Sequence, residues 1–291
     1  MKILFIVNPV AGGGQAGKVW KEKGNEIIAS FPESKAIFTE KPGDAKEISR
    51  EAVKEGYEAV VSCGGDGTLN EVVNGIIGSG LSLGLLPLGT GSDFGKTVGI
   101  RDLGSAIKTI KDNRTMRIDA GMVEFANGGK RYFINSVEAG FGADVMNYVD
   151  SHRRLGSSSF IIGVLASIVR LRRFDAEISV DYRPEKKRTI EIIVANGKYF
   201  GGGMLASPES RPDDNILDIH ILKPIGRLQT IFQLRELING TYIEKGHSYE
   251  FKGKNIEINA ENILIEMDGE VVGKTPVKIS VIPGAINLII P

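Results

Sequence analysis

Three glycine-rich segments hold the polar residues whose types and spacing best fit phosphate chemistry. They are Gly12-Gly13-Gly14, Gly64-Gly65-Asp66-Gly67-Thr68 and Pro87-Leu88-Gly89-Thr90-Gly91-Ser92-Asp93-Phe94, and each follows a short apolar run. Glycine lets the backbone approach a ligand closely, and the first N–H groups of a helix attract an anion. If the three apolar runs are parallel strands, the loops at their carboxyl ends share one crevice. The spacing therefore favours a nucleotide-phosphate cleft over three separate turns.

Asp66 places a carboxylate inside the second of these loops. A carboxylate there would repel a phosphate unless a metal ion or a proton intervened, which points to Mg²⁺ or to acid–base chemistry. The simpler interpretation is a turn in which Asp66 only caps the helix that follows.

The first loop also fits two other nucleotide motifs. Gly12, Gly14 and Gly17 satisfy the dinucleotide-binding pattern G-x-G-x-x-G, and Glu40 follows the next predicted strand. The same segment comes close to the phosphate loop of nucleoside triphosphatases, but Val19 stands where a hydroxyl should bind Mg²⁺. A tight strand-to-helix turn explains the same glycines, so the three interpretations remain open.

The elements that must position these loops alternate between strand and helix in the first part of the chain. Apolar runs predict strands at 2–7, 35–39, 58–62 and 82–86, and helical periodicity predicts helices at 15–31, 44–54, 68–77 and 103–111. Asp44 is the expected N-cap of the second helix, and Gly56 is expected just after its end. This alternation predicts a doubly wound, mostly parallel α/β sheet over residues 1–119.

After about Asp119 the pattern changes to strands joined by turns. Strands are predicted at 131–137, 176–182, 189–196, 216–222, 248–252, 255–260 and 277–281, with helices at 158–173 and 227–239. This predicts a β-rich second domain, a sandwich or a barrel, over residues 120–283. The last apolar run, Ile286–Ile290, could return to the first domain, so residues 284–291 are assigned to that domain.

Composition excludes several classes of protein. The chain has 291 residues, of which 42% are hydrophobic and 25% charged, as in ordinary globular proteins. Lys plus Arg and Asp plus Glu both number 36, so no bulk basic field favours nucleic acid as a partner. The single cysteine, Cys63, cannot form an internal disulfide, which predicts a reducing, cytoplasmic location.

The longest apolar stretch, Phe160–Val169, has arginines on both sides. Arg153-Arg154 precede it, and Arg170, Arg172 and Arg173 follow it. A membrane span needs about 20 apolar residues, so we expect no crossing of a bilayer. A helix here could still lie at the membrane surface with its arginines on lipid phosphates. Burial against the second domain is the alternative interpretation.

The extended second and third loops resemble those of the diacylglycerol kinase catalytic-domain family, which includes bacterial soluble lipid kinases and, more distantly, sphingosine kinases. The resemblance rests on Asn8-Pro9, on the run from Gly64 through Gly75, on Pro87 through Phe94, and on Asp268-Gly269-Glu270. It implies an α/β ATP-binding domain followed by a β-sandwich lipid-substrate domain. NAD kinases share the shorter Gly-Gly-Asp-Gly core, so that core alone indicates only the wider superfamily.

The resemblance implies a set of site residues. Asp66 would be an essential carboxylate near the phosphates and Mg²⁺, and Asp93 is retained in the third loop. Ser92 replaces the asparagine that the family usually has. The residues implied to bind ATP are Asn8, Thr39, Gly64, Gly65, Asp66, Gly67, Thr68, Thr90 and Asp93.

Two further groups follow from the same resemblance. In the turn Asp213-Asp214-Asn215, the Asp214 carboxylate and the backbone carbonyls of Arg211 and Ile216 would hold a structural Mg²⁺. An Asp-rich surface turn without metal explains this segment equally well. Glu270, within a hairpin-type turn, would accept the proton of the lipid hydroxyl.

Together these features predict a cytoplasmic, ATP-dependent lipid kinase that most closely fits diacylglycerol as acceptor and phosphatidic acid as product. The expected cofactors are ATP and Mg²⁺, and the expected partner is a membrane lipid reached by transient peripheral contact. A homodimer remains open. The alternatives are a soluble-substrate kinase of the NAD kinase type and a dinucleotide-binding oxidoreductase.

Overall fold

The computed structural model describes residues 1–152 and 158–291. Arg153-Arg154, the basic pair expected before the apolar helix, lies outside the described residues. The chain divides into two compact units. The first comprises Met1–Ala120 with Pro283–Pro291, and the second comprises Gly121–Ile282.

The first unit is built on a parallel sheet with the strand order β2-β1-β3-β4-β16, and every neighbouring pair in it is parallel. Its elements are β1 (Ile3–Val7), α1 (Gln15–Ala29), β2 (Lys35–Phe38), α2 (Asp44–Lys54), β3 (Ala59–Gly64), α3 (Asp66–Ile76), β4 (Ser82–Pro87), α4 (Asp93–Thr97), α5 (Leu103–Asp112) and the start of β5 (Arg114–Phe125). Because β1 and β3 are buried along their whole length, their sequences are continuous apolar or small-residue runs rather than alternating ones. The predicted parallel α/β sheet is confirmed.

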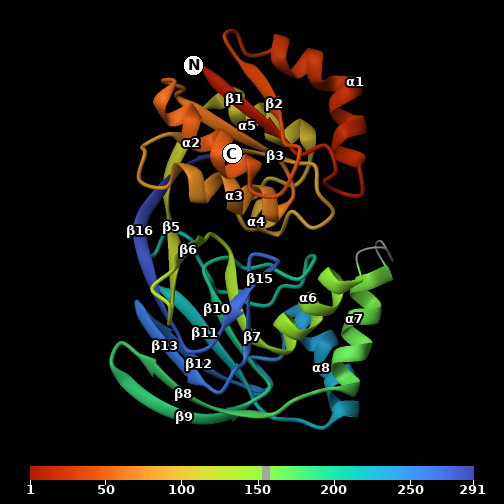
Figure 1. Cartoon of the computed structure of the whole chain (residues 1–291), viewed down its shortest axis with the longest axis vertical. Helices are drawn as coiled ribbons and strands as arrows, with labels where there is room; N and C mark the ends of the chain where they lie inside the picture. Colours follow the sequence, from red (N-terminus) through yellow and green to blue (C-terminus); the bar gives the residue numbers. More distant parts are fainter. Residues whose placement is uncertain (153–157) are drawn as a thin grey trace. The chain divides into compact units, whose positions relative to one another are not determined.

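The long strand β16 (Val277–Ile290) belongs to both units. Its first part pairs with β13, and Asn287 and Leu288 near its end pair in parallel with Ser82 and Leu83 of β4. It also lies beside β5 (Figure 1). The carboxylate of buried Asp119 on β5 accepts the N–H of Gly284 at 2.8 Å. The prediction that the last apolar run returns to the first domain is therefore confirmed.

Helix α2 begins differently from the prediction. Gly43 is the N-cap, and Asp44 is the first helical residue. The Asp44 carboxylate turns back and accepts the N–H groups of Glu40 and Lys41, which lower the pKa of this side chain. Asp44 therefore closes the preceding turn instead of capping the helix. Gly56 lies just past the helix end with φ +70°, as predicted.

The second unit is a β-sandwich, and its described residues include three helices. One sheet has the antiparallel order β12-β11-β10-β7-β14-β15, and the other contains β5, β6, β8, β9, β13 and the first part of β16. The bounds are β6 (Lys130–Phe133), β7 (Ser136–Gly140), α6 (Phe141–Ser151), α7 (Ser158–Val169), β8 (Phe174–Val180), β9 (Arg183–Thr189), β10 (Glu191–Ala195), β11 (Leu217–Leu222), α8 (Arg227–Asn239), β12 (Ser248–Gly253), β13 (Asn255–Ala260), β14 (Leu264–Met267) and β15 (Glu270–Lys274).

Apolar side chains from both sheets of this unit form one core, which includes Phe133, Ile178, Ile192, Ile219 and Ile258. The sandwich is therefore confirmed over the barrel. The helices α6, α7 and α8 lie together at one side of the unit (Figure 1).

Several parts of the second unit differ from the sequence prediction. The single strand expected at 131–137 is two strands, β6 and β7, which belong to different sheets. Helix α6 and strands β5, β9, β14 and β15 were not predicted, although a hairpin-type turn was expected at Asp268-Gly269-Glu270. The sequence of β9, Arg-Pro-Glu-Lys-Lys-Arg-Thr, lacks apolar residues because this strand forms an edge of its sheet and exposes most of its side chains.

Candidate active site

Asp66 joins the second and third glycine loops of the first unit. It is the first residue of α3, after Gly65 as N-cap. Its Oδ2 accepts the N–H of Asp93 and its Oδ1 accepts the N–H of Phe94, both at 3.1 Å. The interpretation in which Asp66 merely caps its own helix is wrong. This carboxylate fixes the start of α4 against the start of α3.

Two carboxyl groups lie close together at this point. Burial, and then the nearby charge of Asp93, raise the pKa of Asp66, while the backbone N–H donors act in the opposite direction. Asp93 is itself buried, and its Oδ1 accepts a hydrogen bond from Lys96 Nζ at 3.1 Å. The two carboxylates repel each other, and the Lys96 ammonium group lies beside one of them. A divalent cation bound between the carboxylates would stabilise the pair.

The close approach of the second and third loops depends on glycine. The carbonyl of Gly64 accepts the N–H groups of Leu88 and Gly89 at 3.0 and 2.9 Å. A Cβ added at Gly89 would lie 2.5 Å from the Cα of Gly65. No larger residue fits there without moving one of the two loops.

The first loop belongs to the same cluster. Asn8 Nδ2 donates to Thr68 Oγ1 at 2.9 Å, which links the end of β1 to the start of α3. Gly12 has φ +62°, and a Cβ on it would lie 2.9 Å from the Leu88 carbonyl oxygen. Gly17 packs equally closely on the Pro9 carbonyl. Packing contacts thus account for both glycines, and the tight-turn interpretation describes this segment without a dinucleotide.

The other residues implied to bind ATP lie at or near the same strand ends. Thr39 directly follows β2, and its N–H binds the Val7 carbonyl at 2.9 Å. Thr90 is exposed in the third loop. Ser92 adopts the left-handed conformation, with φ +48°, and its buried Oγ has no hydrogen-bond partner in the described part of the chain. An asparagine tolerates this backbone conformation better than a serine does. The serine at this position also buries a hydroxyl group without a hydrogen-bond partner among the described residues.

In the second unit, Asp268-Gly269 form the two-residue turn between β14 and β15, with φ of +47° and +90°. The predicted hairpin is confirmed. The buried Asp268 carboxylate accepts three backbone N–H groups, from Ile134, Asn135 and Ser136, at 2.9 to 3.0 Å. These contacts interrupt the strand that the sequence predicted at 131–137, since they hold the backbone between β6 and β7.

Glu270 follows this turn as the first residue of β15, and its side chain is exposed. Its Oε2 pairs with Arg131 NH2 at 2.7 Å. Sequence reasoning missed Arg131, because it lies 139 residues away in the chain and no motif surrounds it. The ion pair gives the Glu270 carboxylate a fixed partner.

Sequence reasoning also missed a group of glutamates next to this turn, in which Glu191 and Glu266 are buried and Glu138 is partly buried. Glu138 on β7 lies directly opposite Glu266 on β14, and burial followed by the charge of Glu138 raises the pKa of Glu266 well above its usual value. The same causes raise the pKa of Glu191. Glu191 Oε2 accepts the N–H of Gly142 at 2.6 Å, whereas its buried Oε1 has no partner among the described residues. Glu266 in turn accepts the N–H of Gly269, so this group supports the turn that precedes Glu270.

The turn expected to hold a structural metal has the predicted backbone. Asn215 is left-handed with φ +62°, and Asp214 Oδ1 accepts the Ile216 N–H at 3.1 Å. The Arg211 guanidinium pairs with Asp213 at 3.2 Å. Among residues 1–152 and 158–291, no three acidic, histidine or cysteine side chains are grouped so that they could hold a metal ion. The expected ligand set has one carboxylate and two carbonyls, so it remains a prediction.

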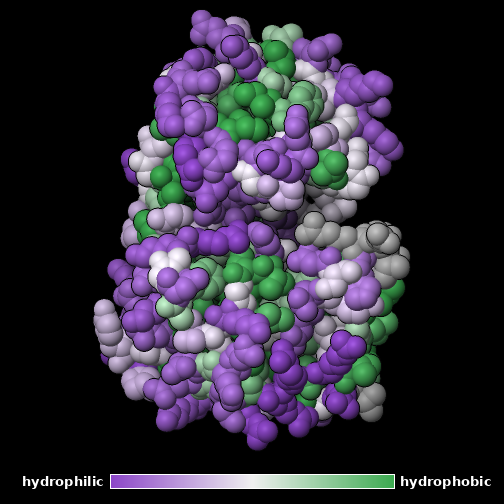
Figure 2. All heavy atoms as spheres, viewed as in Figure 1, coloured by the Kyte–Doolittle hydropathy of each residue, from purple (hydrophilic) through white to green (hydrophobic). Residues whose placement is uncertain are grey.

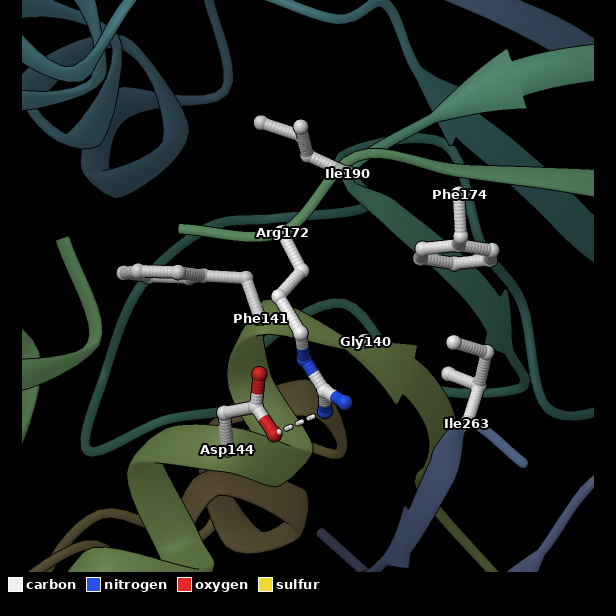
Figure 3. Close-up of a pocket in the computed structure, with 7 residues that line it drawn as sticks. All are labelled: Gly140, Phe141, Asp144, Arg172, Phe174, Ile190 and Ile263. Carbon is white, nitrogen blue, oxygen red and sulfur yellow. Dashed lines mark hydrogen bonds and ion pairs between the residues drawn. The ribbon is translucent and has the colours of Figure 1, made fainter. Parts of the chain in front are cut away.

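A narrow pocket in the second unit contains none of the predicted site residues. It lies between Phe141, Phe174, Ile190 and Ile263, and the Arg172–Asp144 ion pair of 2.8 Å lies at one side (Figure 3). Its lining is apolar on one side and charged on the other.

Comparisons with known proteins agree with this architecture. The model of the diacylglycerol kinase catalytic domain matches residues 2–123, and the model of the YegS C-terminal NAD kinase beta sandwich-like domain matches residues 135–290. The chain is 25% identical to a diacylglycerol kinase of Mycobacterium tuberculosis, over 100% of this chain and 95% of that protein. It is 31% identical to a YegS-like protein of Klebsiella pneumoniae, named as a probable lipid kinase, over 86% and 83% of the two chains.

A solved structure supports the fold over the full length. The chain matches a Bacillus anthracis protein assigned as a diacylglycerol kinase with a TM-score of 0.81 and 26% identity, covering 100% of this chain and 95% of that one. From the loops of the first unit, the sandwich of the second and these matches, we conclude that the chain is an enzyme of the diacylglycerol kinase family of lipid kinases.

Proposed function

We propose that this protein transfers the γ-phosphate of ATP to the hydroxyl group of diacylglycerol and releases phosphatidic acid and ADP. The observation that carries the proposal is the Asp66 carboxylate, which joins two glycine loops at the carboxyl ends of β3 and β4. Ligands of open α/β sheets bind at such strand ends. The relatives named diacylglycerol kinase support the choice of acceptor.

The first unit has the chemistry to hold ATP. Glycine backbones, the start of α3 and the Asn8 and Thr68 side chains offer hydrogen-bond donors to phosphate groups. The unsatisfied Ser92 hydroxyl offers one more buried polar atom in the same cluster. We assign Thr39 and Thr90 to the remaining contacts with the nucleotide.

Asp66 and Asp93 are the residues that would hold Mg²⁺. Two adjacent buried carboxyl groups, one with a raised pKa, gain stability from a divalent cation. When bound, Mg²⁺ would neutralise negative charge on the phosphate groups. Phosphoryl transfer depends mainly on such charge stabilisation and on positioning. Asp214, with the carbonyls of Arg211 and Ile216, is the proposed place for a second, structural Mg²⁺.

Glu270 is the proposed proton acceptor. The lipid hydroxyl oxygen forms a bond to the γ-phosphorus as the bond from that phosphorus to ADP breaks, and the hydroxyl proton passes to a Glu270 oxygen. Arg131 holds the other side of this carboxylate by its ion pair and so orients the accepting oxygen. The proposal includes a cytoplasmic location with transient contact with the membrane surface.

The test is a radiolabelled-ATP assay across a panel of lipids and NAD, with each product identified by mass spectrometry. We expect label in phosphatidic acid when diacylglycerol is present and none in NADP. Asp66→Asn serves as the inactive control. Labelled NADP with no labelled lipid would replace this function with the NAD kinase alternative.

A further inference from the structure

Helix α7 has a buried face that carries small residues and an exposed face that is apolar. Ser159, Gly163 and Ser167 lie on the buried face, at intervals of four residues. A Cβ on Gly163 would lie 3.3 Å from both the Tyr148 ring and the Val145 carbonyl oxygen, so glycine lets α7 pack closely on α6. This contact fixes the rotation of α7 and determines which face points to solvent.

The opposite face of α7 exposes large apolar side chains at the same interval. Ile161, Leu165 and Val169 are 66, 55 and 67% exposed, and Ile162 lies beside them. Helix α8, which contacts α7, exposes Phe232 by 73%. We call the exposed apolar residues of these two helices the α7–α8 patch, and it comprises Ile161, Ile162, Leu165, Val169, Ile231, Phe232 and Ile238.

The α7–α8 patch holds half of the large hydrophobic side chains that are exposed in the described part of the chain. Figure 2 shows hydrophobic residues along the edge of the second unit where α7 runs. Single exposed apolar residues are ordinary, but such a concentration on two neighbouring helices indicates an interaction surface.

On α7, on α8 and at Arg170, the charged side chains without an ion-pair partner among the described residues are all basic. Helix α7 contains no acidic residue, and exposed Arg170 follows its end. Helix α8 exposes Arg227 and Arg235, while its one acidic residue, Glu236, is paired with Lys245 and His247 at 2.7 Å. A surface of apolar side chains with unopposed arginines complements an anionic lipid surface.

The three arginines after α7 differ in their contacts. Arg172 is paired with Asp144 at 2.8 Å, and Arg173 donates two hydrogen bonds to the Ile225 carbonyl. These two side chains therefore support the fold of the second unit. The Arg170 backbone N–H donates to the Ala166 carbonyl, but its guanidinium forms no hydrogen bond or ion pair with any residue that the structure describes, which leaves its charge available to a lipid phosphate.

We propose that the α7–α8 patch docks the protein on an anionic membrane surface. The proposal rests on the proposed function, because it gives the enzyme access to an acceptor that lies in a bilayer. No helix in the described ranges is long and apolar enough to span a bilayer. A second copy of this chain fits the patch less well, because pairing two such faces would bring arginine against arginine.

The test measures co-sedimentation with vesicles of phosphatidylcholine, with and without phosphatidylglycerol. The variant Ile161→Gln/Val169→Gln should weaken binding to both vesicles by about ten-fold or more, from the loss of inserted apolar area. The matched control Val53→Gln/Tyr182→Gln changes exposed apolar residues elsewhere and should bind like wild type.

Arg170→Gln should weaken binding about five-fold, only to the anionic vesicles and only at low salt. Arg188→Gln, on exposed β9, is its control.

Phosphorylation of a water-soluble short-chain diacylglycerol separates this proposal from the proposed function. The Ile161→Gln/Val169→Gln variant should keep wild-type activity on it and lose activity on vesicles. Equal vesicle binding by this variant and wild type would overturn the docking surface, even if the kinase activity stands. Normal vesicle binding without lipid phosphorylation would overturn the function and leave the surface in place. A wild-type dimer that the same substitutions dissociate, seen by sedimentation velocity, would assign the patch to a second copy.

Discussion

The change Asp66→Asn tests whether one carboxylate both joins the glycine loops and serves phosphoryl transfer. An asparagine can accept one of the two N–H groups of Asp93 and Phe94, but its amide nitrogen would face the other. A hydrogen bond to a charged group contributes about 1.5–3 kcal/mol. Removing the charge also relieves the burial and repulsion that raise the pKa of Asp66. The net loss of stability should therefore be about 1–2 kcal/mol.

Activity should fall much further than stability. Loss of a preorganised electrostatic group typically costs about 10²–10³-fold in kcat. We expect this loss at saturating Mg²⁺, with the melting temperature lowered by about 2–8 °C. The assays are thermal unfolding and the radiolabelled-ATP assay on the same preparation.

The chain offers a matched control for this variant. Asp44 is also the first residue of a helix, and its carboxylate also accepts two backbone N–H groups, but these belong to Glu40 and Lys41 rather than to a glycine loop. Asp44→Asn should leave kcat unchanged. Wild-type kcat in Asp66→Asn, or an equal loss of kcat in Asp44→Asn, would refute the reasoning.

Three further predictions concern the second unit and the metal. Glu270→Gln should lower kcat by about 10²–10⁴-fold with little change in the KM for ATP, and a change in that KM alone would remove Glu270 from proton transfer. Burial raises the pKa of Glu191 above its usual 4.5, so the folded state binds the proton more tightly and stability should fall as pH rises from 4.5 through the raised pKa. Urea unfolding measures the free energy of unfolding, and the value for Glu191→Gln minus that for wild type should be larger at pH 8 than at pH 4. The same difference at both pH values would contradict this. Chelation with EDTA should abolish lipid phosphorylation and added Mg²⁺ should restore it, whereas full activity in EDTA would exclude Mg²⁺ from the reaction.

Local sequence predicted the parallel sheet well, because the relevant signals lie within a few residues of one another. Continuous apolar runs such as Ile3–Val7 identify buried strands, and the glycines that follow them identify the loops. The hairpin at Asp268-Gly269 was predicted on the same basis. In each case the residue types match the backbone conformation that they adopt.

Contacts between distant residues account for what local sequence did not predict. The break between β6 and β7 depends on the Asp268 carboxylate, which is more than 130 residues away in the chain. The Arg131–Glu270 pair and the buried glutamates depend on strand register in the same way. The sequence indicated that Asp66 was chemically important, but its bonds to Asp93 and Phe94 required the fold.

Strand β16 pairs with strands of both units, and this affects how the chain folds during synthesis. The Asn287 side chain bonds to Ser82 at 2.9 Å across a separation of 205 residues. The ribosome must therefore synthesise the whole second unit before β16 can pair with β4. Until then, the edge of β4 has unpaired N–H and C=O groups that can pair with a strand of another chain. A fragment that ends at Ala120 would keep that edge permanently, so we expect it to aggregate, and a tethered copy of residues 283–291 should rescue it.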